Sequence, residues 1–316
     1  MTSSTDRLEL RARPCRSTTV FALSLLVATS ITACGSYRPP STLLTARPSA
    51  PDWNTVLSRP GHVTLETLET GRIRVGRSDL LDFNDPRTAE LKDDTLFVPV
   101  FAHLIHDDAR GDYLIDTGLD ASFQKRTSGD MRGIFAYKVY AEQRPGEDIV
   151  SQLAARKVTP HGVFFTHLHP DHLSGAASLP RDMRYVVGQG ERPTSVSLLF
   201  YENALVGVRD FEEIDFAHAA PMPPLGPSVD LFGDGSVWAI STPGHTTGHV
   251  SYLVVTKTGP VLLTGDASHT RWGFEHDVAP GKFNDGTRED ARRSFDQLEA
   301  FARMYPQVKV IFGHSL

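Results

Sequence analysis

The residues best suited to chemistry in this chain lie in one short run, residues 166–172, which read THLHPDH. The run places three imidazoles and a carboxylate directly after the apolar residues 163–165. Imidazole nitrogen and carboxylate oxygen together suit a borderline divalent cation such as zinc, whereas magnesium and calcium prefer sites made of oxygen alone. With 13 histidines in 316 residues, chance rarely gives this spacing, so the alternative of unrelated loop histidines is disfavoured.

Local geometry divides this run into two pairs of ligands. Side chains two residues apart on a strand point the same way, so His167 and His169 are expected on an extended strand, binding one cation from one side. Pro170 fixes φ and has no N–H, so it is expected to break the strand. Asp171 and His172 would then project from a loop.

Three further apolar segments end in a glycine followed by a candidate ligand. Residues 237–242 lead through Pro-Gly to His245, residues 261–264 stop at Gly-Asp266, and residues 308–312 stop at Gly-His314. Alone, each such residue is more often an ordinary hydrogen-bonded loop residue. Together with the first run, they predict that buried strands bring several ligands to one edge of a sheet.

This combined pattern resembles the ligand set of the metallo-β-lactamase-fold hydrolases over residues 96–314. The resemblance implies an α/β fold, a four-layer αβ/βα sandwich with its site at one edge of the sheets. It implies two divalent ions, zinc by default, with iron, manganese or cobalt as alternatives. The implied ligands are His167, His169 and His245 at one ion, Asp171, His172 and His314 at the other, and Asp266 bridging both. Residues 113–118 resemble an early strand of that superfamily, whose Asp116 would support the metal loop.

The bridging carboxylate narrows the activity that the resemblance implies. Antibiotic-cleaving members lack this aspartate, whereas lactonases, thioesterases of the glyoxalase II kind and phosphodiesterases keep it. Residues 97–100, 262–269 and 281–283 resemble the N-acyl-homoserine lactone lactonases, enzymes of the quorum-quenching type. We therefore expect a lactone or related ester to be opened by a hydroxide bridging two metals. The open alternatives are thioester or phosphodiester hydrolysis and, outside catalysis, a metal-binding envelope lipoprotein.

Position 269 departs from the lactonase pattern. Those enzymes usually carry a tyrosine three residues after the bridging aspartate, and this chain has His269. An imidazole can also donate a hydrogen bond or a proton near neutral pH, so His269 and Asp171 are the predicted catalytic proton carriers. The alternative for His269 is a solvent-facing loop residue. His249 is expected to support the ligands, with Asp116, Thr166 and Thr242 as further outer partners.

The remaining histidines have no metal-binding context in the sequence. They are expected at ordinary surface or loop positions: His62, His103, His106, His161, His218 and His276. Helices are expected over residues 147–157 and 287–305, the second with Phe295 and Leu298 on a face that packs on a sheet. The apolar stretches 123–140 and 198–201 would be either core or walls of the site.

The amino terminus predicts export. Four arginines precede residues 18–33, sixteen residues without a charge, which is too short for a membrane span and typical of a signal peptide. Residues 31–35 resemble a bacterial lipobox, which implies cleavage before Cys34, lipidation, and a membrane-anchored lipoprotein facing the periplasm or cell exterior. The alternative is a plain signal peptide cut near residue 33. Residues 34–60 would form a tether and residues 61–316 a single hydrolase domain.

Charge and cysteine content limit the remaining classes. The two cysteines, Cys15 and Cys34, both lie in the amino-terminal segment, so the domain has no disulfide and must be stabilised by its core. Loss of residues 1–33 removes four basic and two acidic residues and takes the net charge from −6 to −8. Such a surface is poor for binding nucleic acid, so a nuclease-like member of the superfamily is disfavoured. The expected partner is the small-molecule ester or lactone that the resemblance implies. The sequence does not indicate an oligomeric state.

Overall fold

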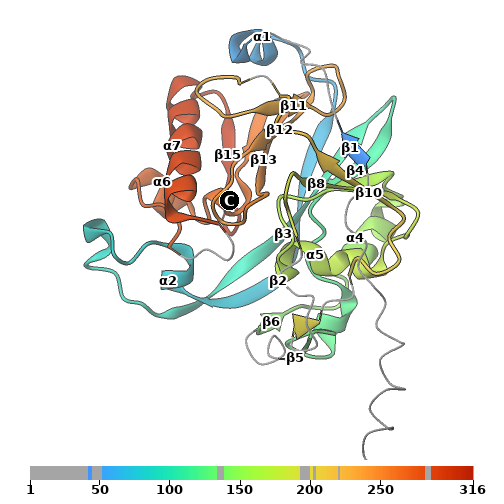
Figure 1. Cartoon of the computed structure of the whole chain (residues 1–316). Helices are drawn as coiled ribbons and strands as arrows, with labels where there is room; N and C mark the ends of the chain where they lie inside the picture. Colours follow the sequence, from blue (N-terminus) through green and yellow to red (C-terminus); the bar gives the residue numbers. More distant parts are fainter. Residues whose placement is uncertain are drawn as a thin grey trace, which may run out of the picture. The chain divides into compact units, whose positions relative to one another are not determined.

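The protein is described by a computed structural model (Figure 1) that covers residues 42–44, 52–133, 139–192, 200–201, 204–219, 221–281 and 286–315. The predicted signal peptide, the lipobox with Cys34, and parts of the apolar stretches 123–140 and 198–201 lie outside these residues. Within the described part, no helix combines the length and apolarity needed to cross a bilayer.

Two mixed sheets form the centre of the domain, which runs from residue 37 onward (Figure 1). The eight-stranded sheet has the order β1 (Thr42–Leu44), β10 (Asp210–Ile214), β8 (Arg184–Gly188), β7 (Gly162–Phe164), β4 (Gly111–Ile115), β3 (Thr95–Asp107), β2 (Thr64–Gly76) and β6 (Ala141–Glu142). The five-stranded sheet has the order β11 (Ser228–Asp230), β12 (Val237–Ser241), β13 (Val250–Thr256), β14 (Gly259–Leu263) and β15 (Lys309–Ile311). Strands β5 (Arg132–Gly133) and β9 (Phe200–Tyr201) form a separate pair.

The helices follow the predicted pattern in their two longest members. These are α4 (Ile149–Arg156), with Asp148 as its N-cap, and α7 (Arg288–Met304), with Thr287 as its N-cap. Each capping side chain accepts a hydrogen bond from a backbone N–H of the first turn, which satisfies a donor that the helix itself leaves unpaired. The shorter helices are α1 (Trp53–Leu57), α2 (Arg77–Leu80), α5 (Pro170–Leu173) and α6 (Arg271–Glu275).

Side chains alternate between the two faces of each strand. They thereby form three hydrophobic layers, one between each pair of neighbouring layers of helices and sheets. On β4, Leu114 packs toward α4 with Leu153, whereas its neighbour Ile115 packs between the sheets with Ala239 of β12. On the far face of the five-stranded sheet, Leu253 packs with Leu298 of α7. The order is therefore helix, sheet, sheet, helix, with α7 and α4 on opposite outer faces (Figure 1). The predicted αβ/βα sandwich is confirmed.

Two parts of the predicted tether, residues 34–60, make contacts with the domain. Trp53 of α1 is buried, its indole N–H donates to the Met222 carbonyl at 2.7 Å, and its ring meets those of Trp238 and Phe301 edge-on at 5.2 and 5.4 Å. Strand β1 also pairs with β10. The Pro/Ser/Thr-rich composition of residues 34–60 is typical of a tether and gives no sign that Trp53 is buried in the core. This ring anchors the segment to the domain.

Replacing this anchor should measure its contribution to the fold. Trp53→Ala is expected to lower the free energy of unfolding by about 3–5 kcal/mol, because it removes a large buried ring and its edge-to-face contacts. Met304→Ala, whose side chain on α7 is 58% exposed, is the control and should change stability by less than about 0.5 kcal/mol. Denaturant unfolding compares the two variants. Equal stability would place Trp53 outside the folded core.

Candidate metal centre

Four strand ends bring the predicted ligands to one place. Strand β7 belongs to the eight-stranded sheet and precedes residues 166–172, whereas β12, β14 and β15 belong to the five-stranded sheet and precede His245, Asp266 and His314. The site is thus assembled from both sheets. The glycines before two ligands have a steric reason. Gly265 has φ +52°, and a Cβ on Gly313 would lie 2.2 Å from Asp266 Oδ1.

The local structure of residues 166–172 differs from the prediction. Strand β7 ends at Phe164, so His167 and His169 lie on the loop that follows it and not on a strand. Pro170 then begins α5 instead of a loop, because its fixed φ and missing N–H suit the first position of a helix. Asp171 and His172 therefore lie in the first turn of α5. The rings of His167 and His169 still meet, with centroids 4.4 Å apart.

The structure brings all seven predicted ligands together around one carboxylate. Asp266 Oδ2 lies 3.4 Å from His245 Nε2, 3.6 Å from His314 Nε2 and 3.7 Å from His167 Nε2. Asp266 Oδ1 lies 3.5 Å from His172 Nε2. Two overlapping groups result, each with donor atoms within 4.8 Å of one another: His167, His169, His245 and Asp266 in one, and Asp171, His172, Asp266 and His314 in the other.

The unpaired polar atoms at this point fit a bound cation. Among the described residues, five buried side-chain nitrogen or oxygen atoms have no hydrogen-bond partner, and four of them belong to the cluster: His167 Nε2, His172 Nε2, His245 Nδ1 and Asp266 Oδ1. A buried polar atom without a partner costs about 1–3 kcal/mol, so such atoms are not expected to gather without a ligand. The donor set of imidazole and carboxylate matches zinc and related divalent ions.

The charges of the cluster also favour a cation. Burial lowers the pKa of His167 and of His245 well below the ordinary value, which keeps these imidazoles in the neutral form that binds metal. At His172, burial acts in the same direction, but the nearby carboxylates of Asp266, Asp171 and Asp116 outweigh it and raise the pKa. The carboxylates therefore create a potential that attracts positive charge.

Outer partners fix the orientation of the imidazoles. His172 Nδ1 lies 2.8 Å from Asp116 Oδ2, and the same carboxylate accepts the Thr166 backbone N–H and hydroxyl. His249 joins Thr242 Oγ1 through Nδ1 and accepts the backbone N–H of Asp266 through Nε2. These contacts confirm the expected supporting positions of Asp116, Thr166, Thr242 and His249. Asp116 holds His172, and His249, itself held by Thr242, holds the backbone of Asp266.

Glu191 ties two ligand loops together, and sequence reasoning missed it. Its side chain is buried; Oε1 accepts the Leu168 N–H at 2.9 Å, and Oε2 accepts the Thr246 hydroxyl at 2.7 Å and the Gly248 N–H at 3.1 Å. Leu168 lies between His167 and His169, and Thr246 follows His245. No motif marks Glu191, because its partners are more than twenty residues away in sequence.

Two histidines for which a surface position was expected or considered are buried. His269 is only 3% exposed, so the alternative of a solvent-facing loop residue is wrong. His103, expected at the surface or in a loop, is buried on β3, where its Nδ1 lies 3.0 Å from Thr67 Oγ1. The other five without a metal-binding context are exposed, as expected: His62, His106, His161, His218 and His276. In the described part of the apolar stretch 123–140, Phe123 and Met131 are buried in a hydrophobic cluster with Leu119, so these two residues belong to the core.

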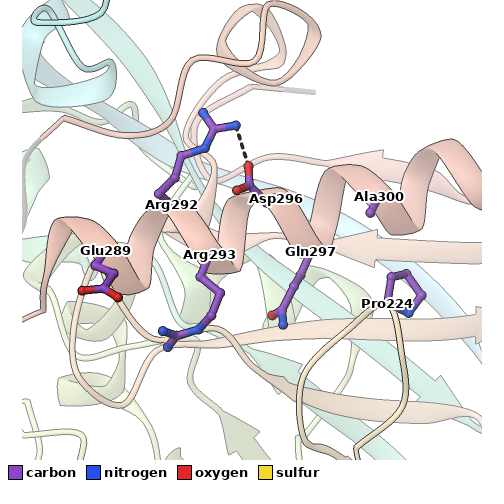
Figure 2. A pocket seen from close by; sticks show the side chains of 7 residues that line it. All are labelled: Pro224, Glu289, Arg292, Arg293, Asp296, Gln297 and Ala300. Atoms are coloured by element: carbon purple, nitrogen blue, oxygen red, sulfur yellow. Dashed lines mark ion pairs between the residues drawn. The ribbon is translucent and has the colours of Figure 1, made fainter.

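Other clusters in the described part of the chain offer weaker sites. Figure 2 shows a pocket of about 460 Å³ along α7, where Arg292 pairs with Asp296. None of the seven predicted ligands lines it. In a group of His62, Asp107 and Asp234, both carboxylates already pair with the guanidinium of Arg110. These places lack the unpaired donor atoms of the Asp266 cluster.

Comparisons with known proteins agree with the geometry. The sequence profile of the metallo-beta-lactamase superfamily matches residues 95–314. An N-acyl homoserine lactonase of Bacillus sp. is 30% identical over 242 residues, 75% of this chain and 89% of the relative. The N-acyl homoserine lactonase AttM of Azorhizobium caulinodans is 27% identical over 176 residues, which are 54% of this chain and only 65% of that relative.

A solved structure shows the same fold. It is an N-acyl homoserine lactone hydrolase with the product N-hexanoyl-L-homoserine bound at its catalytic metal center. The two chains superpose with a TM-score of 0.62 at 21% identity, covering 81% of this chain and 94% of the other.

Removing the carboxylate of Glu191 should weaken metal binding. Glu191→Ala is expected to lower zinc affinity about 10–100-fold, because the loops that carry His167, His169 and His245 lose their common acceptor. Glu191→Gln keeps an acceptor oxygen and should lose less. Competition with a chromophoric chelator measures both affinities. Glu212→Ala, which breaks an ion pair with Arg184 away from these loops, is the control. Unchanged zinc affinity in Glu191→Ala would contradict this role.

Proposed function

Because the chain belongs to the metallo-beta-lactamase superfamily and is a metal-dependent hydrolase, we propose that it opens a lactone or related ester, of the N-acyl-homoserine lactone kind, at a centre of two divalent ions. The observation that carries this proposal is the position of Asp266. One carboxylate oxygen faces His245 at 3.4 Å and the other faces His172 at 3.5 Å, so a single side chain serves both ligand groups. A shared carboxylate of this kind suits paired ions.

The seven residues of the cluster would hold the ions. His167, His169 and His245 would bind one, Asp171, His172 and His314 the other, with Asp266 shared. Zinc is the first choice, since it readily binds imidazole nitrogen together with carboxylate oxygen. Iron, manganese and cobalt accept the same ligands. When bound, such ions polarise an ester carbonyl and lower the pKa of a bound water toward about 7.

The protein's own groups would position this chemistry and carry its proton. Asp116, Glu191 and His249 lie outside the set of seven ligands and hold the ligand loops in place by hydrogen bonds. Asp171 lies in the first turn of α5 with its side chain 16% exposed, and its Oδ2 is 3.5 Å from His314 Nε2. Asp171 is the carboxylate of the cluster that has access to solvent. We therefore assign it the role of returning a proton to the alkoxide of the opened ring.

The choice of a lactone rests on similarity. The Bacillus lactonase aligns over most of its own length, which supports a lactone above a thioester or a phosphodiester. All three substrates can be attacked at the same kind of centre, and pocket shape selects among them. Export and a lipid anchor at Cys34 remain predictions from residues 1–35.

A side-by-side assay tests the function. The zinc-loaded protein is expected to hydrolyse a long-chain acyl-homoserine lactone faster than a thioester or a phosphodiester. Asp266→Ala should lower kcat for the lactone by about 100-fold or more. The variant lacks the carboxylate that would hold both ions in place to stabilise the charge that develops in the transition state.

Asp234→Ala is the matched control, since it removes a carboxylate of the His62 group outside the centre, and it should keep full activity. Hydrolysis of the thioester or phosphodiester alone would transfer the protein to that class. Lactone turnover that persists in Asp266→Ala would overturn the proposed centre.

A further inference from the structure

We propose that His269 is an eighth ligand of the metal centre and binds through Nε2. This inference rests on the centre proposed above and adds to it. His269 Nδ1 lies 3.1 Å from the carbonyl oxygen of Leu80 at the end of α2. A carbonyl oxygen only accepts hydrogen bonds, so Nδ1 carries the proton that points to Leu80. Nε2 is therefore the ring nitrogen left to bind a cation, and it lies 3.3 Å from Asp266 Oδ2.

His269 shares this arrangement with two residues of the cluster. His314 Nδ1 lies 3.0 Å from the Pro99 carbonyl while its Nε2 lies 3.6 Å from Asp266. His172 directs Nδ1 to Asp116 and Nε2 toward Asp266 at 3.5 Å. Ligating histidines characteristically donate their outer N–H to a carbonyl or carboxylate in this way.

The separation between the donor atoms also fits a shared ion. Two atoms that each lie about 2.0–2.2 Å from one metal, at angles near 90–110°, are about 2.8–3.6 Å apart. The 3.3 Å between His269 Nε2 and Asp266 Oδ2 is within that range, and it is shorter than the 3.4–3.7 Å that separate the other Nε2 atoms from this carboxylate.

Its surroundings place His269 among the imidazoles of the cluster. The ring stacks on His314 at 5.7 Å with planes 18° apart, and it meets the His245 ring edge-on at 5.1 Å. With Nδ1 turned to Leu80, Nε2 faces the Asp266 carboxylate at 3.3 Å, and a cation bound there would accept both donor atoms. Metal ligation therefore replaces the proton-carrying role predicted for His269.

Two variants separate ligation from a purely structural role. His269→Gln keeps an amide N–H that can donate to Leu80, and His269→Phe keeps a buried aromatic ring. Both lose the nitrogen ligand. Each is expected to lower zinc affinity at least about 10-fold in chelator competition, whereas the metal-free His269→Gln protein, which keeps a donor for Leu80, unfolds near the wild-type temperature. The control is His276→Gln, an exposed histidine whose Nδ1 also meets a carbonyl. Wild-type zinc affinity in both His269 variants would overturn the inference.

A measurement on the unmodified chain tests the same point, with a substitution used only to assign the resonance. With cadmium-113 bound and histidines labelled with nitrogen-15, the full chain is expected to show scalar coupling from the metal to His269 Nε2. The resonance is assigned from its loss in His269→Gln. Coupling to the other imidazoles but not to His269 would overturn only this inference. Absence of bound metal would instead overturn the proposed centre itself.

Discussion

A carboxylate buried among imidazoles is the constraint on which this structure depends. Asp266 lies in a short 3-10 helix (Gly265–Ala267) after β14, 3% exposed, with five histidine nitrogens within 3.7 Å. A buried charge is tolerated only when paired and hydrogen-bonded, because desolvation otherwise costs several kcal/mol. Imidazoles that are themselves buried cannot all be protonated next to one another. A divalent cation resolves both conditions, since it neutralises the carboxylate and accepts the imidazole lone pairs.

The sequence predicted the parts of this arrangement that depend on local order. The spacing of residues 166–172 and the repeated order of strand, glycine and ligand identified residues that the fold brings together, and Gly313 shows why glycine is needed there. The two long helices were predicted because capping and periodicity are local properties. Pro170 was misjudged because the same fixed φ that breaks a strand also begins a helix.

The remaining features depend on contacts between distant segments. Glu191 matters because it accepts hydrogen bonds from loops 23 and 55 residues away in sequence. Trp53 lies in a segment whose composition is typical of a tether, yet it packs on Trp238. The Nδ1 of His269 meets a carbonyl 189 residues away in sequence. No local pattern contains such information, so the outer supports of the centre become visible only in the folded chain.

The origin of the ligands in both sheets has a mechanical consequence. Residues 166–172 follow β7 of the eight-stranded sheet, whereas His245, Asp266 and His314 follow strands of the five-stranded sheet. An ion held by both groups is a cross-link between the two halves of the sandwich. A shift of one sheet against the other would move the ligands of the ion apart. Metal affinity therefore depends on how the two sheets are aligned. Mutations in the distant interface between the sheets can thereby alter the chemistry without touching the site.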